Sequence, residues 1–253
     1  MRPISQDLRR CFERALFLRP NNNIPANDRL YTRHLSNRDD VIRAVKNVYY
    51  HKNTLWAHAR GGKGLNRATR EHPFIEQVDE QLSLVGGQIF NYLNNPTLRT
   101  VSRANFDVFH KQLCLTFLSG INGIRARAGI PAMSYGQAQK LINLSFKYLT
   151  CYEDYMDYYE YFEQCHMVID REVLKGLEGN GLTLLFGTTP RQIPHLDKGN
   201  YRGHGWTEMN EGEYDELLGE YRNSIDPLLV DIFDDVSYME IEYNLWPMLD
   251  QIR

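Results

Sequence analysis

The chain lacks the features that would place it in a membrane, in an oxidising compartment or around a metal. It has no apolar run of the ~20 residues that a membrane-spanning helix needs, and its first twenty residues contain no apolar signal-peptide segment. Its cysteines, Cys11, Cys114, Cys151 and Cys165, are scattered without CxxC spacing, which favours reduced thiols over disulfides or a zinc site. We therefore expect a cytoplasmic protein with no membrane association, no metal and no cofactor.

Motifs of high catalytic specificity are also missing. The stretch from Gly61 to Gly64 reads Gly-Gly-Lys-Gly and does not fit the GxxxxGK[ST] pattern of a phosphate-binding loop. His195 and His204 lie too far from other ligand types to form a metal-binding pattern. With 253 residues, 42% of them hydrophobic and 24% charged, the chain resembles an ordinary globular protein. We expect one domain spanning residues 1–253.

Charge is distributed unevenly along the chain. Residues 1–150 hold 22 Lys and Arg against 10 Asp and Glu, whereas residues 151–253 hold 7 against 22. The halves therefore carry about +12 and −15. A basic half suggests a polyanionic partner, and an acidic half could cover it, repel nucleic acid or contact another chain. Alternatively, the halves neutralise each other inside one fold.

Helical periodicity dominates the sequence, and strand patterns are scarce. Apolar residues recur at spacings of three and four between capping residues and Pro, Gly or Asn breaks. We predict an all-α fold of seven to nine helices, with helices at Ser5–Leu18, from Ser36 or Asn37, at Phe74–Leu93, Ser102–Leu118, from Tyr135, and at Asp170–Leu177, Glu211–Ile225 and Ser237–Ile252. The only expected strand is a short one at Leu182–Phe186.

The stretch from Tyr135 to Asp170 is the centre of this prediction. It begins with the clearest helix of the chain, on which Gln139, Asn143 and Lys147 follow one another at i, i+4 spacing. A polar edge of this kind is either a solvated face or part of a functional cleft, because buried polar groups need partners. A run of tyrosines follows, and it favours a packed aromatic stripe over a base-stacking surface.

Two residues near the end of this stretch have both structural and chemical interpretations. Asp170 precedes a short helix, where a side-chain oxygen can cap the free backbone N–H groups, or it could act in catalysis. Cys165 and His166 are adjacent in sequence, so their side chains diverge and do not make a catalytic dyad. His166 could instead orient Asp170.

The glycine-containing stretch GIRARAGIPAMSYGQAQK ends at Lys140, and Asp170 follows in HMVIDREVL. Through these residues the chain shows a resemblance, over about residues 118 to 175 and less than a quarter of its length, to the helix-hairpin-helix DNA glycosylase superfamily, including phage relatives that act on hypermodified thymine. The resemblance implies an all-α fold, hairpin amides that bind a DNA phosphate, an aspartate that assists attack at the sugar and, in some members, a nucleophilic lysine. Lys140 matches that lysine best, and Lys147 is the second choice.

We therefore predict a DNA-acting enzyme that cleaves the N-glycosidic bond of a flipped base or modifies the base. Lys140 and Asp170 would be catalytic, and the substrate would be bound by Gln137, Asn143, Lys147, Tyr135, Tyr148 and His166. The basic residues Lys63, Arg67, Arg125 and Arg127 would contact DNA phosphates. Two alternatives stay open: a non-catalytic helical protein that binds a protein partner through its acidic half, and an RNase that uses Arg103 and His110. The sequence leaves the oligomeric state open.

Overall fold

A computed structural model describes residues 4–17, 30–50, 74–95, 102–178, 183, 187, 192–232 and 237–249 of the chain. These residues form nine α-helices: α1 (Gln6–Phe17), α2 (Arg38–Tyr50), α4 (Ile75–Leu93), α5 (Arg103–Arg127), α6 (Tyr135–Leu149), α7 (Tyr159–Phe162), α8 (Arg171–Glu178), α10 (Glu211–Ile232) and α11 (Tyr238–Leu249). Two short strands, β1 (Leu196–Asp197) and β2 (Asn200–Tyr201), pair as an antiparallel hairpin. The all-α prediction is confirmed for this part of the chain.

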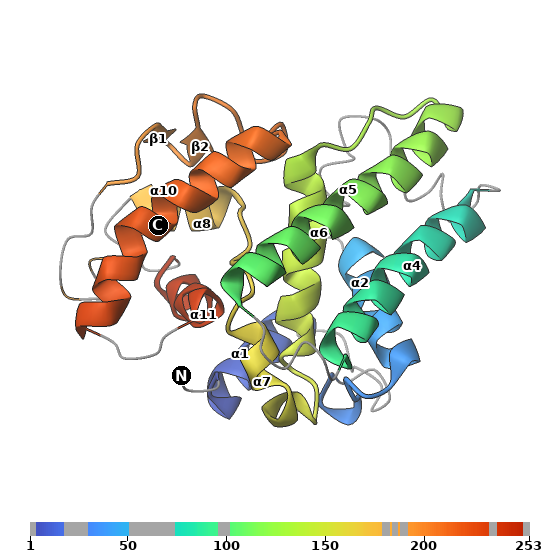
Figure 1. Ribbon diagram of the computed structural model, residues 1–253, viewed down its shortest axis with the longest axis horizontal. Coiled ribbons are helices and arrows are strands. Elements are labelled where there is room, and N and C mark those ends of the chain that lie inside the picture. Colours follow the sequence, from blue (N-terminus) through green and yellow to red (C-terminus); the bar gives the residue numbers. More distant parts are fainter. Residues whose placement is uncertain are drawn as a thin grey trace.

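Helix α6 lies at the centre of the fold, with other helices on both sides (Figure 1). On one side α2 and α5 pack against it, and α4 packs against both of them. On the other side α10 contacts α6, while α8 contacts α11 and the hairpin. Every residue of α6 except Gln137 is buried. The helix predicted to organise the chain is therefore the one that the other helices surround.

Local chemistry fixes where α6 begins. The Ser134 hydroxyl accepts the Gln137 backbone N–H, and the Gln137 side chain accepts the Ser134 N–H in return, which is a complete capping box. The next turn lies directly against the chain after the hairpin, since the Gly136 N–H donates to the Met209 carbonyl at 2.9 Å. A Cβ on Gly136 would overlap the Trp206 carbonyl oxygen, so only glycine fits there.

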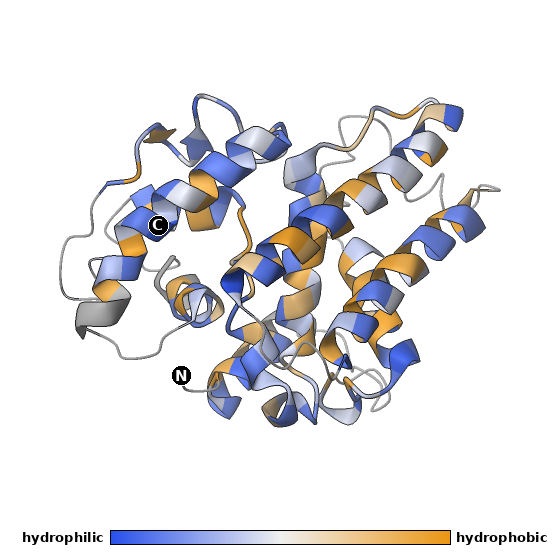
Figure 2. Ribbon diagram, viewed as in Figure 1, coloured by the Kyte–Doolittle hydropathy of each residue, from blue (hydrophilic) through white to orange (hydrophobic). Residues whose placement is uncertain are grey.

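One hydrophobic core runs through the described residues, from Ile4 to Leu245. Most helices contribute one hydrophobic side to it and expose a hydrophilic one (Figure 2). The tyrosines at the end of α6 and after it belong to this core, because Tyr148, Tyr152 and Tyr155 are at most 2% exposed. The packed aromatic stripe is confirmed, and the hydroxyl oxygen of Tyr148 is buried with its ring.

Two predicted helix ends are wrong. Helix α5 continues to Arg127 instead of ending near Leu118, because Ile121 and Ile124 extend its buried face and Gly120 lets it pack closely against Gln81. Helix α10 also runs beyond its predicted end, through Pro227. Because α5 is longer than predicted, the connection between α5 and α6 is short. Gly129 lies in this connection and adopts a left-handed backbone conformation, at φ 69°.

Ion pairs join the basic and acidic halves of the chain. Lys111 on α5 contacts Glu211 at 2.6 Å and Asp215 at 2.9 Å on α10. Arg103 contacts Asp226 at 2.7 Å. Part of the positive charge of the first half is therefore neutralised by the second half within the fold, as one of the alternatives above proposed.

Several predicted segments lie outside the described residues. Among them are residues 58–73, which include the predicted phosphate contacts Lys63 and Arg67, and the expected strand at residues 182–186 apart from Thr183. Among the helices that are described, none is long and apolar enough to cross a membrane.

Candidate functional site

The two residues predicted to be catalytic contact each other. Lys140 projects from α6 and its Nζ lies 3.0 Å from Oδ2 of Asp170, the residue that precedes α8. Both side chains are less than 10% exposed, at 8% and 9%. The other oxygen of Asp170, Oδ1, accepts the N–H groups of Glu172 and Val173 at 3.1 Å each. The predicted capping role is confirmed, and Asp170 uses one oxygen for the helix and one for the lysine.

An aromatic ring lies beside the pair. The indole of Trp206 is 4.5 Å, centroid to Nζ, from Lys140, and Trp206 is 4% exposed. A cation over an indole face is attracted by the ring quadrupole. The segment from Trp206 to Met209 is held against the start of α6 by its close approach to Gly136. Lys140 is therefore bounded by a carboxylate and an indole.

The polar edge of α6 is buried and lies against an extended segment, residues 166–170. Gln139 donates to the Ile169 carbonyl at 2.7 Å, and Asn143 donates to the Met167 carbonyl at 3.0 Å. The two amides also bond to each other, from Asn143 Nδ2 to Gln139 Oε1 at 2.9 Å. These side chains replace the neighbouring strand that an extended backbone normally requires. For Gln139 and Asn143 this is a structural role.

Lys147, the second choice for the nucleophile, lies two turns further along α6. Its Nζ is 2.6 Å from Oε1 of Glu242 on α11, and both side chains are 1% exposed. Glu242 Oε2 accepts the Val168 N–H at 2.8 Å, so the same carboxylate also binds the extended segment. The rings of Phe12 and Tyr243 lie 4.6 and 4.8 Å from Nζ. Lys147 is thus enclosed in the core, and Lys140 is the lysine of the pair with Asp170.

His166 belongs to a separate buried network. Its Nε2 lies 2.7 Å from Asp107 Oδ1 and its Nδ1 lies 2.9 Å from the Tyr214 hydroxyl. Because a carboxylate only accepts, we assign the proton to Nε2, so that the Tyr214 hydroxyl donates to Nδ1. Arg222 completes the network with two hydrogen bonds of 2.7 Å to Asp107. Both nitrogens of His166 are occupied, so the idea that His166 orients Asp170 is wrong.

In this network, burial and the charged partners have opposing effects on each pKa, and the pKa values of His166 and Asp107 are both lowered. Burial lowers the pKa of His166, although Asp107 works against this change. Burial alone would raise the pKa of Asp107, but hydrogen bonds from Arg222 and His166 outweigh it and lower that pKa well below its usual range. We therefore assign a neutral His166 and an ionised Asp107 at neutral pH, with Arg222 as the charged partner.

The residues of the suggested RNase site have different partners. The His110 ring lies 4.4 Å from the His166 ring, centroid to centroid, and His110 is 1% exposed. Burial lowers the pKa of His110 well below its usual value. Arg103, whose side chain is 42% exposed, pairs with Asp226 instead.

The other predicted binding residues are dispersed. Tyr135 and Tyr148 pack in the core, with ring centroids 5.4 Å from Tyr214 and 5.8 Å from Phe12, respectively. Gln137 belongs to the capping box described above.

Of the two predicted phosphate contacts that the structure describes, one is buried and one is exposed. Arg125 is 8% exposed and donates from Nε to the Pro131 carbonyl at 2.6 Å. Arg127, at the end of α5, is exposed and donates to Gln77 Oε1 at 2.6 Å. Contact with DNA stays a prediction for both.

Sequence reasoning missed the partners that define these sites: Trp206, Glu242, Asp107, Tyr214 and Arg222. None of them is near its partner in sequence; Glu242, for example, is 95 positions from Lys147. One feature of the sequence pointed to such partners. The central helix carries two lysines, Lys140 and Lys147, and a lysine on a buried helix needs a carboxylate from elsewhere in the chain.

Comparisons with protein-family models, curated proteins and solved structures found no match for this chain. Among the described residues, no group of three or more His, Cys, Asp or Glu side chains is placed to hold a metal ion.

Proposed function

We propose that this protein acts on DNA through Lys140 and Asp170, and that it cleaves the N-glycosidic bond of a flipped base or modifies that base. The observation that supports the proposal most is their contact. Two residues chosen for their chemistry, 30 positions apart, lie 3.0 Å from each other. The resemblance to helix-hairpin-helix DNA glycosylases suggested this lysine and this aspartate before any contact between them was visible.

The contact allows a balanced reaction for the glycosylase case. Asp170 takes a proton from the Lys140 ammonium, and the free amine attacks C1′ of the deoxyribose. The bond between C1′ and the base nitrogen breaks, and its electron pair leaves with the base. The base then takes up the proton from Asp170, which returns the carboxylate to its starting state. The C1′–O4′ bond then opens, and O4′ takes up a proton from the nitrogen now bound to C1′. This leaves a protonated imine between Lys140 and C1′, which water hydrolyses to release the lysine.

A flipped base that reaches Lys140 would meet Trp206, whose indole covers one side of the amine. An indole in this position is suited to stack on the base, as aromatic side chains do in base-flipping enzymes. We expect Trp206→Ala to weaken binding of the flipped base.

Activity on duplexes that carry modified pyrimidines tests the proposal, with base release measured by mass spectrometry. Asn also caps helices, so Asp170→Asn keeps the hydrogen bonds to α8 and removes only the charge. We expect Asp170→Asn and Lys140→Met to lower the rate by a factor on the order of 100 or more. Borohydride should trap a covalent complex with the wild type and none with Lys140→Met.

The control is Lys175→Gln on α8, because this lysine is 42% exposed and, among the described residues, forms an ion pair only with Glu172, at 4.0 Å. It should retain wild-type activity. Full activity of Asp170→Asn, or no DNA binding at low salt, would refute the proposal. Binding should weaken steeply as salt increases, in proportion to the number of phosphates that the protein neutralises.

A further inference from the structure

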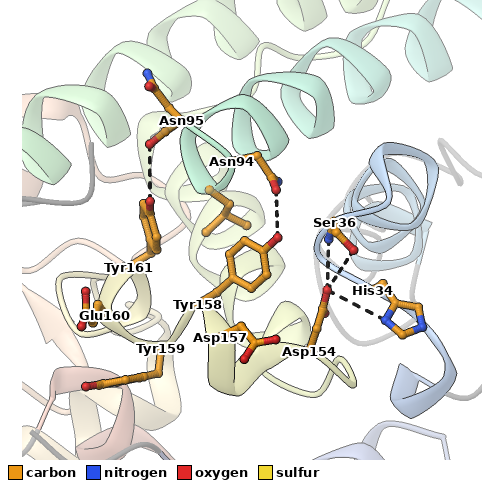
Figure 3. A pocket seen from close by; sticks show the side chains of 11 residues that line it. His34, Ser36, Asn94, Asn95, Asp154, Asp157, Tyr158, Tyr159, Glu160 and Tyr161 are labelled. Atoms are coloured by element: carbon orange, nitrogen blue, oxygen red, sulfur yellow. Dashed lines mark hydrogen bonds and ion pairs between the residues drawn. The ribbon is translucent and has the colours of Figure 1, made fainter. Parts of the chain in front are cut away.

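A cavity of about 620 Å³, whose lining includes neither Lys140 nor Asp170, lies beside the C-terminal end of α4 (Figure 3). Its wall is formed by the C-terminal end of α4, the residues that precede α2 and the segment from Asp154 to Tyr161. Pockets for small ligands measure roughly 300–1,000 Å³, so this cavity has the size of a ligand site.

Three carboxylates line the cavity, and only one of them is used by the fold. Asp154 accepts the backbone N–H groups of Leu35 at 2.7 Å and Ser36 at 3.1 Å, which holds the turn before α2. Asp157 and Glu160 are exposed, and their side chains form no hydrogen bond or ion pair with any other described residue. Nothing in this part of the chain therefore explains why two negative charges face the same cavity.

The end of α4 adds negative potential on the opposite wall. This helix has 19 residues, and Asn94 is its C-cap. The C-terminus of a helix carries a partial negative charge from its free carbonyl groups, and this favours cations nearby. The helix end and the carboxylates are separate sources of negative potential, because the end of α4 and the segment that carries the carboxylates are about 60 residues apart in the chain.

Tyrosines complete the wall, and their hydroxyls are tied to α4. Tyr158 donates to Asn94 Oδ1 at 2.9 Å, and Tyr161 donates to the Asn95 carbonyl at 3.4 Å. These bonds hold the two aromatic rings along the cavity (Figure 3). Burial raises the pKa of Tyr158, and the nearby Asp154 and Asp157 raise it further, as expected where the potential is negative.

We propose that this cavity binds a small organic cation, a compound with alkylammonium or guanidinium groups. Carboxylates supply charge-assisted hydrogen bonds to such groups, and tyrosine rings supply cation–π contacts. An organic cation fits better than a metal ion, because the acidic residues are not grouped as metal ligands. The proposal does not depend on the action on DNA proposed above.

Calorimetry on the full chain without DNA tests this site with matched pairs of charged and neutral probes. 1,4-Diaminobutane is compared with 1,4-butanediol, and arginine with citrulline. We expect only the charged member of each pair to bind. N-acetyl-arginine amide, which imitates an arginine within a peptide, separates two sources of the same chemistry. Binding of this probe and not of the free compounds would indicate a protein side chain as the natural ligand.

The decisive variant is Asp157→Asn combined with Glu160→Gln. Both side chains are exposed and have no hydrogen-bond or ion-pair partner among the described residues, so the fold should keep its melting temperature. We expect affinity to fall about tenfold or more, since each carboxylate supplies a charge-assisted hydrogen bond. The control is Glu208→Gln, an exposed carboxylate near His204 on another part of the chain, which should bind like the wild type. Equal binding of neutral probes, wild-type affinity of the double variant, or no binding of any probe at millimolar concentration would overturn the proposal.

Discussion

Replacement of Glu242 by Gln should destabilise the protein more than any single surface substitution. Lys147 and Glu242 are each 1% exposed, so Glu242→Gln removes the charge of the carboxylate that pairs with a buried ammonium. Gln has nearly the same shape and can still accept the Val168 N–H, so packing and that hydrogen bond change little. Loss of one partner of a buried ion pair costs about 3–5 kcal/mol, which is a large part of a typical unfolding free energy of about 5–15 kcal/mol.

The assay is urea denaturation of Glu242→Gln, Lys147→Met and the double variant. The double variant removes both charges, so it should be more stable than Glu242→Gln alone, and the coupling energy should reach about 2 kcal/mol or more. Glu216→Gln is the matched control. It breaks a pair with Arg202 in which the side chains are 43% and 51% exposed, and it should cost less than about 1 kcal/mol. A loss below about 1 kcal/mol for Glu242→Gln, or additive single effects, would refute the structural role of Lys147.

Three further predictions concern stability and reactivity. His110 and His166 have lowered pKa values because they are buried, so the unfolded chain binds more protons below its usual histidine pKa of about 6.5. Stability should therefore fall as the pH drops from 7 to 5, by up to about 2.7 kcal/mol per pH unit; unchanged urea midpoints would contradict this, and His166→Asn should flatten the slope. Gly86→Ala would press a Cβ against the Ile42 backbone and should destabilise the protein in thermal denaturation. Gly219→Ala in α10 would bring its Cβ within 4 Å of no other described residue beyond the adjoining helix backbone, and it should stabilise the protein by about 0.5–1 kcal/mol in the same assay. Cys11 is the exposed thiol among the four cysteines and should react alone with a thiol reagent in the native state, whereas all four should react in urea; fast modification of a second thiol without denaturant would argue against the core described here.

Local features of the fold could be predicted from the sequence. Periodicity located the helices, and Asp170 marked the start of α8 through its ability to accept backbone N–H groups. Helix ends were less predictable, because Gly120 reads as a helix breaker until the close packing of α4 and α5 explains it. Capping is decided within four residues, whereas packing is decided by segments far away in the chain.

The polar edge of α6 shows why the site was harder to predict than the fold. The sequence offered a solvated face or a cleft, and Gln139 and Asn143 instead bind the backbone of the extended segment that ends at Asp170. Such partners are invisible to local reasoning, because main-chain groups carry no sequence signature. The spacing of Gln139 and Asn143 predicted correctly that they act together, but it did not reveal what they bind.

The two lysines of α6 show how a structural and a functional interpretation can be separated on one helix. Both are paired with carboxylates, but Glu242 divides its oxygens between Lys147 and a backbone N–H inside the core, at 1% exposure. Asp170 divides its oxygens between Lys140 and the first turn of α8, and this pair is more exposed, at 8% and 9%. A carboxylate at a helix start is stabilised by the cap whether or not the lysine is present. Asp170 can therefore give up Lys140 to a substrate and keep its hydrogen bonds to the first turn of α8, whereas loss of the contact between Glu242 and Lys147 would separate two charges that are each 1% exposed. That difference makes Lys140, and not Lys147, the residue whose replacement should change activity more than stability.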